Sequence, residues 1–314
     1  MTRLLVTGAD GFVGRHLVRA ARRAGRSVVA SVLPGADPPT EWADPAGGSV
    51  VDVTFADLTS DGDVRRLAQI DADQVVHLAA MASGAAARRD PEGAMRVNSA
   101  GLAGFIGALR DTGRPLRFLF VSTAEVYGAG HTGPIAETAT PHPVSPYGAS
   151  KLAAEHALAA EAGAGSIRVI IARAFPHTGP GQSTEYVLPA LAARLLDARR
   201  NGHREVPVGN LEAIRDFLDV RDVVGAYLAL LSREVPVGVY NVASGVGRRL
   251  SDCFTELAAL IGVEAQPTQD ASLMRPSDIP ALIGDATLLT HTTGWSPRIP
   301  FERTLQDLID AQAY

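Results

Sequence analysis

The chain has 314 residues, of which 46% are hydrophobic and 20% are charged, so it can bury the core of one large domain or of a large and a smaller one. Its net charge of −5 gives no general attraction for nucleic acid or an anionic membrane, and no apolar run is long enough to span a bilayer. With a single cysteine, Cys253, in an apolar helical pattern, it cannot form an intramolecular disulfide. We expect a soluble cytoplasmic protein with no nucleic-acid or membrane partner.

Apolar runs of strand length alternate with amphipathic helical stretches through the first two-thirds of the chain. The predicted strands are 4–6, 27–32, 50–55, 74–78, 118–122 and 167–172, and the helices between them include 12–23, 95–109 and 151–161. Val, Ile and Leu fill these strands almost continuously, which is typical of a parallel sheet covered on both faces. The alternation predicts an α/β fold with a doubly wound parallel sheet of the Rossmann type.

After residue 175 the pattern changes. Short segments rich in Pro, Gly and Arg mix with predicted helices at 187–199 and 251–261. We therefore predict a dinucleotide-binding domain at 1–175, to which 219–245 return, and a smaller C-terminal α/β substrate-binding lobe in the rest of 176–314. A cleft between them would be the natural ligand site. The Pro- and Gly-rich stretch 34–48 is predicted to be a surface loop.

A glycine-rich turn, Thr7-Gly8-Ala9-Asp10-Gly11-Phe12-Val13-Gly14, joins the first predicted strand to the first helix. In a dinucleotide fingerprint Gly8 allows the tight turn, Gly11 lets the backbone approach the pyrophosphate, and Gly14 lets helix and strand pack closely. The pyrophosphate then rests on the helix N-terminus, which offers free N–H groups. Because strand, turn and helix occur in the required order, we predict a dinucleotide site rather than a turn without a ligand.

Tyr147 and Lys151 are four residues apart just after Pro146. In a helix they would lie one turn apart on one face. An ammonium near a phenol favours the phenolate, which predicts a pKa for Tyr147 below its ordinary value of about 10. Such a tyrosine can exchange a proton with a sugar hydroxyl or ketone near neutral pH. Ordinary helix surfaces also supply this spacing, but Lys151 is the only lysine of the sequence.

Three more motifs lie between these two in chain order. They are Asp57-Leu58 after the third strand, His77-Leu78-Ala79-Ala80 after the fourth, and Ser122-Thr123-Ala124-Glu125-Val126-Tyr127-Gly128 after the fifth. With this order of motifs the chain resembles the extended short-chain dehydrogenase/reductase family, the NAD-dependent epimerases and dehydratases. The resemblance covers essentially the whole chain.

The resemblance implies a catalytic set. Tyr147 would be the acid/base, and Lys151 would lower its pKa and hold the nicotinamide ribose. Thr123, rather than its neighbour Ser122, would hydrogen-bond the reacting sugar oxygen. Glu125 lies where the dehydratases of the family place an additional base. We predict no metal ligands.

The resemblance also implies a cofactor site. Its residues would be Gly8, Gly11, Phe12, Val13, Gly14, Arg15, Asp57, Leu58, Ala79, Ala80, Met81, Asn98, Tyr147 and Lys151. On the bare sequence Asp57 fits a turn and Asn98 a helix cap equally well. Members selective for NAD carry an acidic residue at the end of the second strand, where this chain reads Ala30-Ser31-Val32-Leu33. Because no carboxylate repels a 2′-phosphate there, and Arg15 or another arginine can attract one, NADP is favoured and NAD is possible.

The second half of the chain narrows the substrate. The segments 175–182, 208–217, 219–223 and 275–280 are similar to those of family members that reduce a GDP-linked sugar. The implied substrate-binding residues are His177, Val187, Pro189, Asn210, Arg215, Arg275 and Asp278. The two arginines would clamp the diphosphate, Asp278 would take the ribose hydroxyls, and Val187 with Pro189 would line the base pocket.

The expected reaction is therefore NAD(P)H-dependent reduction of the 4-keto group of a nucleotide-linked 4-dehydro-6-deoxyhexose, with GDP-4-dehydro-6-deoxy-D-mannose to GDP-D-rhamnose favoured. A 4,6-dehydratase or 4-epimerase, or a catalytically silent dinucleotide-binding regulator, are the alternatives. The family usually has Asn where this chain has Pro176, a residue without a side-chain donor or a backbone N–H. The resemblance also implies a homodimer formed by the helices near Asn98 and Lys151.

Overall fold

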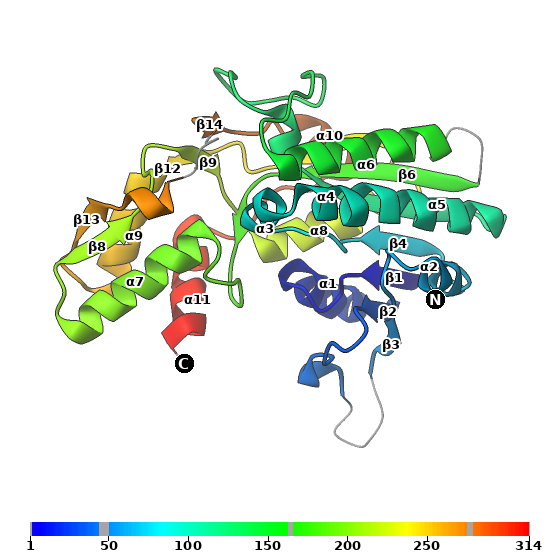
Figure 1. Ribbon diagram of the computed structural model, residues 1–314, viewed down its shortest axis with the longest axis horizontal. Coiled ribbons are helices and arrows are strands. Elements are labelled where there is room, and N and C mark those ends of the chain that lie inside the picture. Colours follow the sequence, from blue (N-terminus) through cyan, green and yellow to red (C-terminus); the bar gives the residue numbers. More distant parts are fainter. Residues whose placement is uncertain (1, 44–49, 163–165, 275–278, 314) are drawn as a thin grey trace.

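The computed structural model describes residues 2–43, 50–162, 166–274 and 279–313 (Figure 1). The strands of its largest sheet are β1 (Arg3–Thr7), β2 (Ser27–Val32), β3 (Asp52–Phe55), β4 (Gln74–His77), β5 (Leu116–Thr123), β6 (Ile167–Ala174) and β11 (Gly238–Val242). They lie in the order β11-β6-β5-β4-β1-β2-β3, and every neighbouring pair is parallel. The chain runs outward from β1 in both directions, so the predicted doubly wound Rossmann sheet is confirmed.

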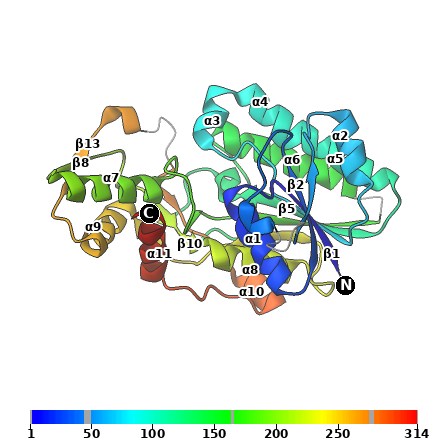
Figure 2. The same ribbon diagram turned by 90° about the horizontal axis from the view of Figure 1, so that it is seen from below.

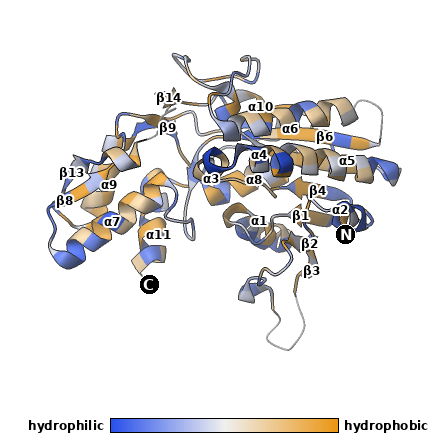
Figure 3. Ribbon diagram, in the orientation of Figure 1, coloured by the Kyte–Doolittle hydropathy of each residue, from blue (hydrophilic) through white to orange (hydrophobic). Residues whose placement is uncertain are grey.

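Helices cover both faces of this sheet (Figure 2). One face carries α1 (Phe12–Arg23), α8 (Val220–Leu230) and α10 (Thr287–Thr293), and the other carries α2 (Asp61–Ala68), α5 (Leu102–Asp111) and α6 (Pro146–Ala162). Each face has its own apolar core: Leu17 and Val223 pack under the first set, and Phe105 and Leu158 under the second. Figure 3 shows the hydrophobic residues along β6, α5 and α6. These two layers of buried side chains hold the strand ends that build the site.

A second group of elements lies to one side of the large sheet (Figures 1 and 2). Its helices are α7 (Val187–Asn201), α9 (Leu250–Ile261) and α11 (Phe301–Ala313). Its strands form a parallel pair, β8 (Glu205–Val208) with β13 (Gln266–Gln269), and a sheet in which β9 (Ile214–Asp216) lies between β12 (Gly247–Arg249) and β14 (Ala281–Leu282). Cys253 is buried in the core of this group, as its pattern predicted. β7 (His177–Thr178) and β10 (Leu218–Asp219) pair where the chain crosses into it and back.

The helix that carries Tyr147 begins earlier than predicted. α6 starts at Pro146 rather than at residue 151, because the Ser145 hydroxyl accepts a hydrogen bond from the Gly148 N–H at 3.0 Å. Proline also suits the first position of a helix. Tyr147 therefore lies inside the helix, and the one-turn spacing to Lys151 that the sequence required is present.

The predicted helix 95–109 is divided. Two short helices, α3 (Gly84–Arg89) and α4 (Pro91–Met95), precede a π-helical turn, η2 (Arg96–Gly101), which leads into α5. At Gly101 a Cβ would lie 2.9 Å from the Leu58 carbonyl oxygen, so the π turn brings the helix backbone against the loop after β3. Apolar periodicity does not distinguish such a turn from an α-helix.

Two further differences concern loops and strands. The predicted surface loop at 34–48 contains a 3-10 turn, η1 (Thr40–Trp42), whose Trp42 packs into the core beside α1; residues 44–49 lie outside the described residues. The seventh strand of the large sheet, β11, was not among the predicted strands, although it falls in the segment expected to return to the first domain.

Two other 3-10 turns are η3 (Ala124–Tyr127) and η4 (Ala271–Leu273). Within the described residues, no helix combines the length and the apolarity that crossing a membrane needs.

Candidate active site

The site lies where the order of the sheet reverses, at the carboxyl ends of β1 and β4. A pocket of ≈ 910 Å³ opens there. One wall comes from the strand ends and α6, and the other from the chain that leads into α7 and from β9. A crevice at the switch point of a doubly wound sheet is the usual binding place for a dinucleotide.

The glycine-rich turn forms the floor of the pocket at β1. Gly8 has a positive φ of 65°, and a Cβ on it would lie 2.8 Å from the Ala79 nitrogen. A Cβ on Gly14 would collide with the carbonyl oxygens of Gly8 and Ala9, so helix and turn pack in close contact. α1 begins with no side-chain cap, which leaves its first N–H groups available to an anion. The geometry thus fits the pyrophosphate of a dinucleotide.

Most of the predicted cofactor residues line this pocket. They are Gly8, Gly11, Phe12, Val13, Gly14, Asp57, Leu58, Ala79, Ala80, Met81, Tyr147 and Lys151. Asp57 also forms the turn that was the alternative, because its Oδ1 accepts hydrogen bonds from the Thr59 N–H and hydroxyl at 2.8 and 2.7 Å. Lining the pocket and closing the turn are compatible, since a carboxylate has two oxygens.

Two predicted cofactor residues lie elsewhere. Arg15 does not line the pocket; its Nε donates to the Asp10 carbonyl oxygen at 2.8 Å on the exposed side of α1. Asn98 is buried behind the pocket wall and is not a helix cap. Its Oδ1 accepts from the Met81 N–H at 2.7 Å, and its Nδ2 donates to the Ser150 hydroxyl at 2.9 Å. Asn98 therefore ties the pocket loop to the helix turn beside Lys151.

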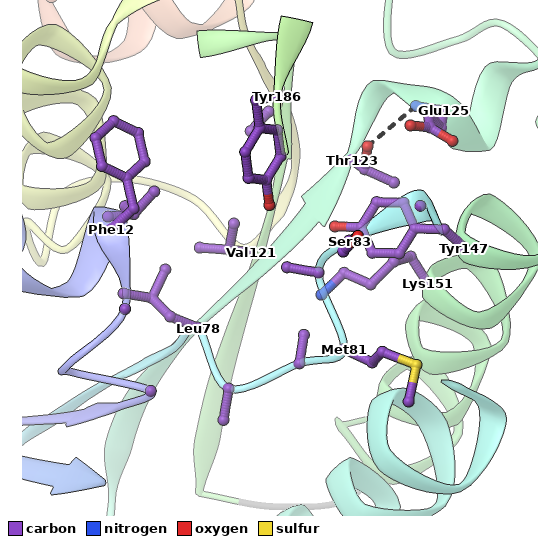
Figure 4. A pocket seen from close by; sticks show the side chains of 18 of the residues that line it. Phe12, Leu78, Met81, Ser83, Val121, Thr123, Glu125, Tyr147, Lys151 and Tyr186 are labelled. Carbon is purple, nitrogen blue, oxygen red and sulfur yellow. Dashed lines mark hydrogen bonds between the residues drawn. The ribbon is translucent and has the colours of Figure 1, made fainter. Parts of the chain in front are cut away.

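The predicted catalytic residues converge on one wall (Figure 4). Tyr147 and Lys151 extend from α6 toward Thr123 at the end of β5. The Thr123 hydroxyl accepts from the Glu125 N–H at 3.2 Å and lines the pocket. Its neighbour Ser122 is 2% exposed and donates its hydroxyl to Glu155. The hydroxyl that remains for a substrate at this point is thus that of Thr123.

The protonation of this wall differs from the prediction. Burial raises the pKa of the Tyr147 phenol above its ordinary value, and the Glu125 carboxylate adds to the rise. Burial also lowers the pKa of Lys151 to about 7, although the Glu155 carboxylate opposes this. Lys151 Nζ lies 4.3 Å from the centroid of the Phe120 ring. The expected lowering of the phenol pKa by Lys151 is therefore wrong for this structure, because loss of hydration is the largest influence on Tyr147 and Lys151 is not among the groups that shift its pKa.

Glu125 is held in a fixed position near the phenol. Its Oε2 accepts a hydrogen bond from the Ser145 hydroxyl at 2.6 Å. The same hydroxyl accepts the Gly148 N–H at the start of α6. One serine therefore links the carboxylate to the helix turn that carries Tyr147.

A buried ion pair supports the wall from behind. Glu155, one helical turn beyond Lys151, binds Arg173 of β6, with Arg173 Nη2 2.7 Å from Glu155 Oε2. The two side chains are 5% and 6% exposed. Since Glu155 also accepts from Ser122, this pair joins α6, β5 and β6 directly beneath the predicted catalytic residues.

The predicted substrate residues divide into three groups. His177, Val187 and Arg215 line the pocket, and Arg215 Nη1 donates to the Ile279 carbonyl oxygen at 2.6 Å. Pro189 and Asn210 do not line it; Pro189 is buried in α7, and Asn210 Oδ1 accepts from the Glu212 N–H at 2.9 Å. Arg275 and Asp278 lie outside the described residues.

Several pocket residues were not predicted. They include Ser83, Arg88, Arg96, Val121 and Tyr186. In the sequence, Arg88 and Arg96 resemble solvated charges on helix surfaces. A single tyrosine before a helix forms no pattern that indicates a site. The two arginines reach the pocket because α3 and η2 pack beside it. This packing depends on the tertiary structure, so no short sequence pattern predicts it.

Comparison with known proteins agrees with this geometry. Residues 4–243 match the model of the NAD dependent epimerase/dehydratase family. The GDP-6-deoxy-D-mannose reductase of Pseudomonas aeruginosa is 35% identical over 98% of this chain and 96% of its own. The GDP-6-deoxy-D-talose 4-dehydrogenase of Aggregatibacter actinomycetemcomitans is 28% identical over 93% of this chain and 91% of its own. The structure of RMD from Pseudomonas aeruginosa complexed with NADPH superposes with a TM-score of 0.85, at 32% identity and 99% coverage of both chains. With the glycine-rich turn, the switch-point pocket and the Thr123, Tyr147 and Lys151 wall, these matches show that the chain belongs to the NAD dependent epimerase/dehydratase family.

Proposed function

We propose that this protein reduces the 4-keto group of a nucleotide-linked 4-dehydro-6-deoxyhexose, with GDP-4-dehydro-6-deoxy-D-mannose as substrate, GDP-D-rhamnose as product and NADPH as reductant. The observation that carries the proposal is the Tyr147 phenol. It lies beside Thr123 in the pocket that also contains the glycine-rich turn, where it can exchange a proton with a bound sugar. The relatives named a GDP-6-deoxy-D-mannose reductase and a GDP-6-deoxy-D-talose 4-dehydrogenase support the substrate class.

The residues divide the work as follows. When bound, the reduced nicotinamide supplies a hydride to C4 of the sugar. The Thr123 hydroxyl donates a hydrogen bond to the C4 oxygen, and Tyr147 gives that oxygen its proton, so the ketone becomes a secondary alcohol. Lys151, below its pKa of about 7, carries a positive charge that stabilises the phenolate left behind. Arg215 on the opposite wall is suited to the diphosphate.

The direction of the reaction is proposed from the relatives. A reductase needs an acid at C4, whereas a dehydratase or epimerase begins by oxidising C4 and needs a base there, and Tyr147 can take either role. The relative named GDP-6-deoxy-D-mannose reductase, at 35% identity over 98% of this chain, favours the acid. The 4,6-dehydratase remains the second candidate because Glu125 lies near Tyr147 as a possible additional base, but its carboxylate already accepts from Ser145.

The deciding experiment supplies freshly prepared GDP-4-dehydro-6-deoxymannose with NADPH. We expect the nicotinamide absorbance to fall in proportion to the substrate consumed. A dehydratase would instead convert GDP-mannose in the presence of NADP⁺ with no net change in the cofactor, and a silent regulator would bind NADPH and turn over neither sugar. Either of those results would replace the proposed reaction.

The choice of NADPH rests on the end of β2. Ser31, Val32 and Leu33 line the pocket and carry no carboxylate, and Arg88 and Arg96 contribute positive charge to the same pocket. We propose that these residues, rather than Arg15, favour the 2′-phosphate. We further propose that 1–175 with 219–245 bind the cofactor, that the remainder of 176–314 binds the sugar nucleotide, and that the protein is a homodimer.

Replacing Leu33 with aspartate tests the cofactor preference. Leu33 is 60% exposed at the pocket, so the substitution adds a charge without disturbing the core. We expect the KM for NADPH to rise at least about tenfold, because like charges repel, while the KM for NADH falls or stays the same. The comparison is made by steady-state kinetics with both cofactors. Leu33→Asn is the uncharged control, and an equal rise in this variant would contradict the electrostatic explanation.

A further inference from the structure

Tyr186 stands in the pocket on the side opposite α6. In Figure 4 its ring lies between Phe12 and Tyr147, with the hydroxyl directed into the space above Lys151. The residue is 37% exposed, and it lines the pocket together with Thr123 and Glu125. It was not predicted as a site residue, because a single aromatic residue before a helix is an ordinary feature of a sequence.

The backbone around Tyr186 is fixed on both sides. Its N–H donates to the Ser183 carbonyl oxygen at 3.1 Å, and its own carbonyl oxygen accepts from the Ala190 N–H at 2.9 Å as α7 begins. These bonds hold the Cα at the helix entry, where the backbone is extended with φ −96° and ψ 153°. These backbone bonds fix the point from which the side chain enters the pocket.

The Tyr186 hydroxyl contributes no hydrogen bond to the fold within the described residues. No hydrogen bond joins it to any residue in 2–43, 50–162, 166–274 or 279–313. On the same wall, His177 Nδ1 lies 3.0 Å from the Phe175 carbonyl oxygen, and Gln182 Nε2 donates to the His177 carbonyl oxygen at 3.0 Å, which leaves only Gln182 Oε1 buried without a partner among the described residues. Pro176 offers no donor at all.

The Tyr186 hydroxyl and the Tyr147 phenol share a neighbour. The Glu125 carboxylate contributes, after burial, to raising the pKa of both groups. Since even a tyrosine of ordinary pKa is protonated at neutral pH, the Tyr186 hydroxyl can both donate and accept a hydrogen bond. A hexose whose C4 oxygen lies at Thr123 and Tyr147 has other hydroxyl groups that need such partners.

We propose that Tyr186 is a specificity-determining residue whose hydroxyl hydrogen-bonds the hexose of the bound nucleotide sugar. It supplies, from the start of α7, the polar contact that Pro176 does not. This inference rests on the proposed function, and it assigns the contact to the sugar and not to the nucleotide or the cofactor.

The test is binding of GDP-mannose and of GDP to the NADP⁺-loaded protein by titration calorimetry, in the wild type and in Tyr186→Phe. Phenylalanine keeps the ring and removes only the hydroxyl. We expect the Kd of GDP-mannose to rise about tenfold, as for the loss of one good hydrogen bond, and the Kd of GDP to stay within twofold. In turnover, the KM of the 4-keto sugar should rise by a similar factor while kcat stays within about threefold.

A matched control is Tyr240→Phe, which removes a phenol hydroxyl bonded to the Pro236 carbonyl oxygen, away from the pocket. It should leave both dissociation constants unchanged. An unchanged Kd for GDP-mannose in Tyr186→Phe, or an equal loss for GDP, overturns the inference and leaves the proposed reaction intact. If the wild type binds neither GDP nor GDP-mannose, the proposed substrate class fails and this inference fails with it.

Discussion

Tyr147→Phe is expected to lower kcat for reduction of the 4-keto sugar by about 10²- to 10⁴-fold, the range for loss of a positioned general acid. The phenylalanine ring fills the same space but has no proton to give to the C4 oxygen. Because the phenol pKa is raised, Tyr147 stays protonated up to at least the ordinary tyrosine pKa of about 10, and a fall in the rate of the wild type above pH 7 would report the loss of the Lys151 charge, since the pKa of Lys151 is about 7. The rate is measured from NADPH consumption under saturating substrate.

The control for this substitution is Tyr227→Phe. The Tyr227 hydroxyl is buried in α8 and has no hydrogen-bond partner among the described residues, so its removal should cost neither stability nor activity. The affinity for NADPH, followed by fluorescence titration, should be retained in both variants. Residual activity of Tyr147→Phe within tenfold of the wild type would remove Tyr147 from the role of acid.

Arg173→Met is expected to lower the free energy of unfolding by about 3–5 kcal/mol, because it leaves the Glu155 carboxylate buried without its partner. Urea denaturation measures the loss. The stranded carboxylate should acquire a raised pKa in the folded state. At pH values between the ordinary and the raised pKa of Glu155, the folded variant binds more protons than the unfolded chain. Its loss in free energy of unfolding relative to the wild type should therefore become smaller as the pH falls.

The double variant Glu155→Met/Arg173→Met separates charge from packing. Two apolar side chains of similar volume replace the ion pair and leave no buried charge, so we expect it to be more stable than Arg173→Met alone. If the double variant is as unstable as the single one, the cost arises from lost packing and not from the unpaired carboxylate. The Ser122 hydroxyl donates to Glu155 and loses this partner in the double variant. The free energy of unfolding should therefore not return fully to the wild-type value.

The sequence predicted the parts of this protein that depend on local pattern. Residues 27–32 and 12–23 form β2 and α1 with the predicted bounds. The first is a short run of small and apolar residues buried on both faces, and the second has helical apolar spacing directly after a glycine-rich turn. Tyr147 and Lys151 lie on one face of α6 for the same reason.

The parts that were wrong or missed depend on tertiary structure. The pKa of Tyr147 follows from how far the phenol is withdrawn from water, which a spacing of four residues does not encode. Glu155 and Arg173 are on different elements, so no short motif pairs them. Arg15 adjoins the fingerprint, and its contact with the cofactor stays a prediction: its side chain does not line the pocket but donates to the carbonyl oxygen of Asp10, which does.

The single lysine gives this protein an unusual chemical property. Lys151 is 2% exposed inside the pocket, and its pKa of about 7 leaves a large fraction of the ε-amino group unprotonated, and so nucleophilic, at neutral pH. Because the chain has no other lysine, an amine-directed reagent small enough to enter the pocket has its one side-chain target there. Mass spectrometry of the labelled protein would then give the fraction of molecules whose pocket is open to the reagent. A ligand that occupies the pocket should lower this fraction, so labelling measures ligand binding without an activity assay.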